Sequence, residues 1–337
     1  MRATSIPAFL LIAFSSWLSD PPCAAAGEWR LSGPYSHDNL TVFLVHADGV
    51  AGDDATMLTL DEALAVKRAV VHETGDVNEL AVENLSPDKW IYVQSGEIVK
   101  GGKQDRVLSV DLVLPPKSGS VPISVFCVEH GRWSGRGEEA ATEFESASKL
   151  VASKDLKLAT KAARSQPDVW NQVAKTQDKL SAVLGQSVAA AASPSSFQLT
   201  LENERLAAAA DAYFRALAPV IDGHADAIGY VFAINGKINS ADVYGQPALF
   251  RKLWPRLIEA SATEAVAEQS AKSAETLSIV DVQAFLAAAE AGAPTVQDLP
   301  AGVRLTTRDA DAAMLFETRV ASSDTADAWI HRNYIAK

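Results

Sequence analysis

The chain has 337 residues, of which 48% are apolar and 21% are charged, and these fractions are close to those of soluble globular proteins. The composition excludes an intrinsically disordered, a collagen-like or a disulfide-stapled protein, and the length is sufficient for two domains. The formal net charge of −12 argues against binding to nucleic acid or to an anionic membrane surface, because both are also negatively charged.

Residues 1–26 have the pattern of a secretory signal peptide. A basic start with Arg2 precedes an apolar run over residues 6–18, and Ala24–Ala26 supplies small residues for cleavage. The apolar run is shorter than the roughly 20 residues of a spanning helix, and no later stretch is long and apolar enough. We therefore expect export to the periplasm or the medium after cleavage near Ala26, and no membrane span.

The two cysteines differ in their context. Cys23 lies in the leader and lacks the small and aliphatic neighbours of a lipidation site. Cleavage after Ala26 leaves Cys127 as the one remaining cysteine, so no internal disulfide is expected.

Residues 27–135 are predicted to form a β-rich domain. Short β-prone runs alternate with turn signals, which favours an antiparallel sandwich or barrel over a parallel sheet with helices between its strands. The predicted strands cover residues 40–45, 69–73, 78–85, 89–94, 108–114 and 121–127.

The rest of the chain is predicted to be a helical segment over 136–226, followed by an α+β segment over 227–337 that packs on the rest. The predicted helices cover residues 138–161, 168–184, 201–218, 247–260 and 278–291, with a linker at 186–196. A hairpin is expected around Asn235-Gly236, and closing strands are expected at 303–308, 313–320 and 328–331. The expected fold class is therefore α+β, with an N-terminal antiparallel sandwich or barrel-like domain.

The first unusual motif is SGEIVKGGKQDR, residues 95–106. Gly101 and Gly102 permit positive φ angles and close approach, while Lys103 and Arg106 place cations beside them. This combination favours an anion site made of backbone N–H groups and a forked guanidinium contact. The alternative is a solvated hairpin loop with basic residues. The order of residues is not that of a Walker phosphate loop.

The second motif is CVEHGRW, residues 127–133, at the end of an apolar strand. The strand, the cysteine and the arginine five positions on resemble the active loop of rhodanese-type sulfurtransferases, which implies a nucleophilic Cys127. Strand alternation, however, places Cys127 on the apolar face, where a thiol is inert. Glu129 and His130 form a candidate general acid/base pair or, alternatively, fix a loop by hydrogen bonds.

The six histidines show none of the spacings of common metal sites, and no metal or cofactor is predicted from them.

Taken in order, several motifs resemble one protein family. They are residues 60–63 (LDEA), 78–84 (NELAVEN), 95–106, 123–133, 168–170 (DVW) and 229–254. This order is similar to that of the ARG and rhodanese-phosphatase-superfamily-associated protein domain, where ARG stands for ADP-ribosylglycohydrolase. The family more often has asparagine at the position of Asp105 and glutamine or another polar residue at that of His130. Its name implies neighbours that handle ADP-ribose and phosphorylated or sulfur-bearing substrates, and implies no particular reaction.

Three hypotheses follow for the function. The first is an exported binding protein of undetermined activity, whose two motifs meet and bind an anionic, nucleotide-like or sugar-phosphate ligand. Its candidate ligand-binding residues are Gly101, Gly102, Lys103, Gln104, Arg106, Glu129, Arg132 and Trp133. The second is a transferase or hydrolase that uses Cys127, with Glu129 or His130 assisting. The third is an envelope protein-interaction module with an unknown partner.

Overall fold

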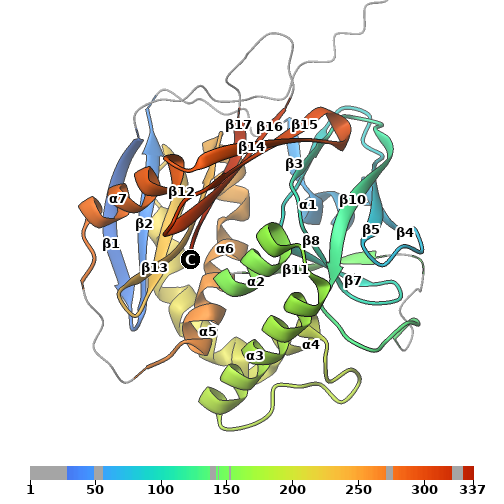
Figure 1. Ribbon diagram of the computed structural model, residues 1–337, viewed down its shortest axis with the longest axis horizontal. Helices are drawn as coiled ribbons and strands as arrows, with labels where there is room; N and C mark the ends of the chain where they lie inside the picture. Colours follow the sequence, from blue (N-terminus) through green and yellow to red (C-terminus); the bar gives the residue numbers. More distant parts are fainter. Residues whose placement is uncertain are drawn as a thin grey trace, which may run out of the picture.

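The computed structural model (Figure 1) describes residues 29–48, 56–136, 142, 144–151, 153–270, 276–320 and 329–337. The expected leader, with Cys23 and the cleavage site, lies outside the described residues. Among the described residues, no helix combines the length and the apolar character needed to cross a membrane.

The largest element is an eight-stranded, fully antiparallel sheet that contains strands from both ends of the chain. Its order is β1-β2-β12-β13-β17-β16-β15-β14. The strands are β1 (Trp29–His37), β2 (Leu40–Ala47), β12 (Ala227–Ile234), β13 (Lys237–Tyr244), β14 (Ala293–Leu299), β15 (Val303–Asp309), β16 (Ala313–Val320) and β17 (Trp329–Ala336).

Both faces of this sheet are covered in its centre. Helix α7 (Ile279–Glu290) packs its buried Val282 and Leu286 on one face, and helix α6 (Pro247–Ala267) packs on the other. All eight residues of β12 are buried, as expected for a central strand between two helical layers. Figure 1 shows the blue β1 and β2 beside the yellow β12.

The second part is built from residues 57–150 and contains two smaller sheets. The six-stranded antiparallel sheet has the order β11-β7-β8-β10-β5-β4, and the three-stranded sheet has the order β3-β6-β9. The strands are β3 (Met57–Thr59), β4 (Ala69–Glu73), β5 (Glu79–Asn84), β6 (Trp90–Val93), β7 (Glu97–Gly101), β8 (Arg106–Leu108), β9 (Leu112–Leu114), β10 (Gly119–Cys127) and β11 (Phe144–Leu150). Edge strands β11 and β4 are in contact, so the six-stranded sheet is nearly closed and barrel-like. The parallel β3–β6 pair departs from the antiparallel expectation.

The helices between these parts complete an α+β fold, as predicted. The α-helices besides α6 and α7 are α1 (Leu60–Ala65), α2 (Lys154–Leu158), α3 (Gln166–Leu184), α4 (Phe197–Leu201) and α5 (Glu204–Leu217). The π-helical turn η1 (Ala159–Ala163) continues α2, the 3-10 turn η2 (Ala218–Ile221) continues α5, and a further 3-10 turn covers Pro300–Gly302. Helix α3 confirms the predicted helix over 168–184, and β12 and β13 confirm the hairpin.

Two predicted elements are wrong. The helix predicted over 138–161 is replaced at 144–150 by strand β11, because pairing with the exposed edge of β7 outweighs the helix propensity of these residues. The strand predicted over 108–114 is two short strands, β8 and β9, in different sheets. The chain turns between them because Ser109 and Asp111 point inward to buried hydrogen-bond partners.

The predicted division at residue 135 does not follow the sheets. Strands β1 and β2 come from residues 27–135, yet β2 hydrogen-bonds to β12 in the C-terminal segment. The domain division itself stays a prediction.

Candidate functional site

The two motifs singled out in the sequence are neighbours in the structure. Strand β10 pairs antiparallel with β8, and Cys127 lies opposite Arg106 in the register. The loop from Gly102 to Asp105 therefore lies beside the irregular segment from Val128 to Arg136, and Val128 N donates to Asp105 O at 3.1 Å.

A buried charge cluster, which we define as Asp105, Glu129, Arg132 and Arg136, joins the two segments. Arg132 lies 2.7 Å from a Glu129 carboxylate oxygen and 3.5 Å from Asp105 Oδ1. Arg136 donates to both oxygens of Asp105, at 3.0 and 3.3 Å. Two positive and two negative side chains thus neutralise one another.

Glu129 is the best-satisfied member of this cluster. Burial alone raises the pKa of its carboxyl, but hydrogen bonds from Arg132 and Ser193 outweigh burial and hold the pKa below its usual value. Its Oε2 also accepts from Asp105 N at 3.2 Å. Glu129 is therefore an ionised anchor for the loop.

Most of the predicted ligand-binding groups are used inside the loop. The carbonyls of Gly101 and Gly102 accept from Arg132, Gly101 N donates to Asp105 Oδ1 at 3.1 Å, and Gln104 Nε2 donates to Glu129 O at 3.1 Å. These residues hold the loop in shape, and the charge cluster has little capacity left for a ligand.

Gly102 is required by the loop geometry. Its φ is +54°, and a Cβ placed there would lie 2.2 Å from the Phe144 ring of β11. Gly102 therefore permits close packing of Phe144 on the loop.

Three of the predicted ligand-binding residues lie outside the charge cluster: Lys103, Arg106 and Trp133. Trp133 is 47% exposed, and Lys103 Nζ lies 5.1 Å and Arg106 Cζ 5.7 Å from its ring centroid, within cation–π range. Arg106 is fully buried, and it donates from Nη1 to Gln104 O at 2.8 Å. In the described part of the chain, its Nε and Nη2 have no hydrogen-bond partner, and the nearest carboxylate, Glu73, is 4.0 Å away.

The candidate catalytic residues Cys127 and His130 differ in their surroundings. Cys127 is buried, and this burial raises the pKa of its thiol despite the positive charge of Arg106 nearby. The side-chain amide of Gln166 accepts a hydrogen bond from Cys127 N and donates one to Cys127 O, both at 2.8 Å. His130 is exposed and packs edge-on against Trp170, with ring centroids 4.5 Å apart.

A second constellation, missed in the sequence, lies where the large sheet meets the smaller sheets. We define this central polar cluster as Asp111, Asp242, His331, Lys157 and Lys161. His331 Nδ1 lies 2.9 Å from Asp111 Oδ2, and its Nε2 lies 3.1 Å from Asp242 Oδ1. Lys157 Nζ lies 3.5 Å from Asp242 Oδ2, and Lys161 Nζ donates to Asn333 Oδ1 at 2.9 Å.

The charges in the central polar cluster perturb one another strongly. Burial raises the pKa of Asp242, but Lys157 and His331 outweigh it and bring the pKa to about 2. Burial lowers the pKa of Lys161 to about 8 although Asp111 and Asp242 oppose the change. Lys161 also donates to Ser95 Oγ at 3.0 Å, a pairing known from serine–lysine nucleophiles. The adjoining cavity, which Lys157, Lys161 and Asp242 help to line, measures about 10 Å³ and has room for one water molecule.

No sequence signal marks this cluster, because its members are spread from residue 111 to residue 331 and lie in five different elements or loops. Asp111 was expected on the polar face of a single strand, and His331 belonged to no recognised spacing.

A larger cavity of about 540 Å³ lies between α6 and the β12–β13 turn. Its lining includes Glu264, Glu268, Lys154 and Lys179, with Asn239 at its edge. Burial, together with the charge of Glu268, raises the pKa of Glu264 to about 7.

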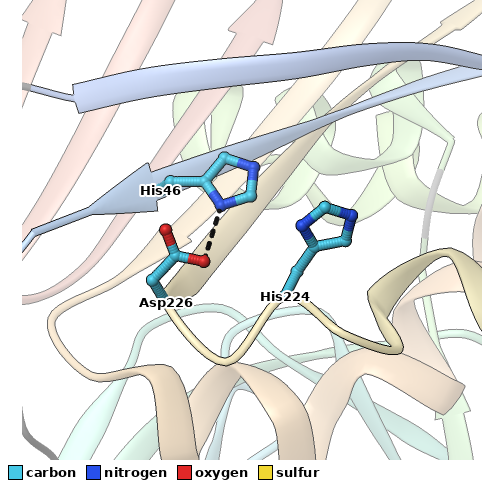
Figure 2. Close-up of side chains that lie close together, drawn as sticks. All are labelled: His46, His224 and Asp226. Carbon is cyan, nitrogen blue, oxygen red and sulfur yellow. Dashed lines mark hydrogen bonds and ion pairs between the residues drawn. The ribbon is translucent and has the colours of Figure 1, made fainter.

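A third polar group contains side chains suitable for a metal ion: His46 on β2, with His224 and Asp226 in the loop before β12 (Figure 2). Their nearest ligand atoms all lie within 4.8 Å of one another, and His46 Nδ1 lies 3.1 Å from Asp226 Oδ1. No local spacing in the sequence marks this group, because His46 and His224 are far apart in the chain.

No curated protein and no solved structure gives a significant match to the chain. A family model matches residues 28–335, which is nearly the whole chain. The chain therefore belongs to the ARG and Rhodanese-Phosphatase-superfamily-associated Protein domain family.

Proposed function

We propose that this chain is an exported protein that binds a small anionic ligand, nucleotide-like or a sugar phosphate, at Lys103, Arg106 and Trp133. The single observation that carries the proposal is Arg106, a buried guanidinium with two donor nitrogens that lack hydrogen-bond partners among the described residues. A buried donor without a partner is costly, and an anion satisfies both nitrogens of a guanidinium fork at once.

The local charge agrees with an anionic ligand. Of the two cations Lys103 and Arg106, Glu73 compensates the charge of Arg106, because its Oε2 lies 4.0 Å from Arg106 Nη2. The same oxygen accepts a hydrogen bond from the backbone N of Lys103 at 3.4 Å. The Lys103 side chain then leaves one positive charge at the surface in a protein whose net charge is −12. Trp133 lies over Arg106, so its indole has to move aside for an anion to reach the guanidinium.

The exposed indole also suggests how an aromatic ligand is held. A purine or pyrimidine ring has a face that stacks on tryptophan, and once the indole has moved off Arg106 the phosphate of the same ligand would reach Lys103 and Arg106. In this arrangement, Gly101, Gly102, Gln104, Glu129 and Arg132 shape the loop and do not touch the ligand.

The other two hypotheses have less support. The buried thiol of Cys127, with its raised pKa, is poorly suited to act as a nucleophile. No described surface points to a protein partner of the helical segment. Export itself is supported by the leader pattern of residues 1–26.

The test is a thermal-shift and calorimetry series with ADP-ribose, a sugar phosphate and inorganic phosphate. A ligand at 100 times its Kd stabilises the native state by about 2.7 kcal/mol, which is easily seen in Tm. We expect Trp133→Ala and Lys103→Gln to reduce the affinity by about 1–2 kcal/mol each, because each removes one contact. Arg106→Lys retains the buried charge but loses the forked pair of guanidinium N–H donors. Its affinity for the anion should therefore fall at least as much as that of Trp133→Ala or Lys103→Gln.

Lys175→Gln is the matched control, since Lys175 is an exposed lysine on α3, outside the proposed site. The proposal is wrong when no anion of the series shifts the wild-type Tm, or when Trp133→Ala and Lys103→Gln bind as well as the control.

A further inference from the structure

We propose that His46, His224 and Asp226 form a binding site for a divalent transition-metal ion, with Zn²⁺ as the ion that suits them best. The site lies where β2 ends and the loop before β12 meets it (Figure 2), and it shares no residue with the proposed anion site. Two imidazoles and one carboxylate are a ligand set that zinc accepts, with the fourth tetrahedral position open to water.

The backbone already holds the three residues together. His46 lies on β2 and pairs in register with Ala227, the first residue of β12. Ala47 N donates to Asp226 O at 3.2 Å, so Asp226 is fixed directly beside His46. Arg251 donates to His224 O at 3.0 Å and holds the loop from the side of α6. Sites supported by sheet hydrogen bonds are better positioned than sites on free loops.

The distances come close to tetrahedral coordination. With zinc bonds of 2.0–2.1 Å, ligand atoms around the ion lie about 3.3 Å apart. His46 Nδ1 and Asp226 Oδ1 are 3.1 Å apart, which already fits. All three ligand atoms lie within 4.8 Å, so His224 has to move inward by about 1.5 Å at most. This movement is available because His224 is only partly buried, and the hydrogen bond that its ring makes within the described part of the chain, between Nε2 and Tyr35 OH, is long at 3.4 Å.

The second nitrogen of His46 supports the assignment. His46 Nε2 lies 2.7 Å from Ser32 Oγ, and a metal-bound histidine characteristically donates its other N–H to a neighbouring oxygen. His46 Nδ1 and Asp226 Oδ1 lie 3.1 Å apart, so Nδ1 either carries a proton that it donates to the carboxylate or offers its lone pair to a cation between the two atoms. A metal ion would replace that proton, and Ser32 would accept from Nε2–H.

The charged side chain of Arg30 contacts the carboxylate of this group. It forms an ion pair with Asp226 Oδ2, which leaves Oδ1 directed at His46. This contact orients the carboxylate in the way that outer hydrogen bonds orient metal ligands.

The experiment uses the purified protein without a histidine tag, stripped of metal by a chelator and then titrated with Zn²⁺ by calorimetry and with Co²⁺ by visible absorption. We expect one ion per chain and a Co²⁺ ligand-field band of tetrahedral intensity. His224→Ala and Asp226→Asn should weaken binding at least tenfold, because each removes one of three protein ligands. His72→Ala is the matched control: His72 is a partly exposed histidine on β4 that pairs with Glu83 at 3.6 Å, and its loss should leave binding unchanged.

Both ligand variants change partly exposed loop residues, and their apo Tm values, compared with that of the apo wild type, report whether each is folded. The proposal is overturned when the wild type binds no stoichiometric ion. It is equally overturned when His224→Ala and Asp226→Asn, with the fold retained, bind Zn²⁺ as tightly as the His72→Ala control.

Discussion

Glu264 is a buried carboxyl on α6 whose environment favours the protonated form. No hydrogen bond or ion pair reaches its carboxylate from the described residues, and the neighbouring Glu268 is engaged by Lys179. Burial and the Glu268 charge raise the pKa of Glu264 from 4.5 to about 7. Because the unfolded chain releases this proton near pH 4.5, the folded state holds one proton more between these two values.

We therefore predict that Glu264→Gln makes the protein less sensitive to pH. As the pH rises from 4.5 to 7, the wild type should lose up to about 3 kcal/mol of unfolding free energy relative to the variant. The reason is that stability falls with rising pH wherever the folded state binds more protons than the unfolded state. Above pH 7 the difference should be constant. Urea unfolding at several pH values measures it.

Glu259→Gln provides the matched control on the same helix. Glu259 forms a surface ion pair with Lys149, and such a pair contributes less than about 1 kcal/mol. Equal pH profiles for wild type and Glu264→Gln would show that Glu264 is ionised in the folded state.

The end of helix α6 depends on the turns of two hairpins. The last carbonyls of a helix have no hydrogen-bond donors within the helix. Here the side-chain amides of two asparagines donate to carbonyls at the end of α6. Asn39, in the β1–β2 turn, donates to Ala265 O at 3.0 Å, and Asn235, in the β12–β13 turn, donates to Glu268 O at 2.7 Å. The Asn235-Gly236 turn has φ angles of +53° and +73°, as a type I′ turn requires. One asparagine therefore serves both the hairpin and the helix.

Two substitutions at Asn235 separate these roles. Asn235→Ala should lower the unfolding free energy by about 2 kcal/mol, because it loses the hydrogen bond to α6 and places an unsuitable residue at positive φ. Asn235→Gly loses the same hydrogen bond but tolerates the φ angle, so its loss should be about 1 kcal/mol or less. Urea unfolding measures both. Equal losses would show that the turn conformation contributes nothing.

The molecule as a whole is joined by the eight-stranded sheet and the central polar cluster. Strand β2 pairs with β12, and Asp111, between β8 and β9, is hydrogen-bonded to His331 and Thr318 of the large sheet at 2.9 and 2.7 Å. Separating the parts would expose the apolar faces of β2 and leave a buried carboxylate without its partners. Breaking such a buried pair typically costs about 3–5 kcal/mol.

We therefore predict that residues 27–135, the β-rich segment expected from the sequence, do not fold alone. The fragment should give a poorly dispersed amide spectrum and no cooperative thermal transition, whereas the full chain should unfold in one transition. A dispersed spectrum with a cooperative transition would instead support an independent N-terminal domain.

Local sequence patterns were sufficient to predict some of the elements of this molecule and its family. The Asn235-Gly236 signal predicted the hairpin, the apolar stripe of α3 predicted its helix, and the motif order predicted the family, because each depends on residues that are close in sequence or on their order. The glycines and charged residues of GGKQDR and CVEHGRW also marked a real meeting point, since β8 and β10 pair directly.

Long-range pairing decided the rest. Residues 144–150 are helix-prone but become β11, because the free edge of β7 offers hydrogen bonds that local propensity cannot outweigh. Arg132 appeared free to bind a ligand until the fold placed it against Glu129 and Asp105. His46 and Asp226 became neighbours only through the β2–β12 pairing. Burial and charge pairing act between residues that are adjacent in space, and only the tertiary structure determines which residues those are.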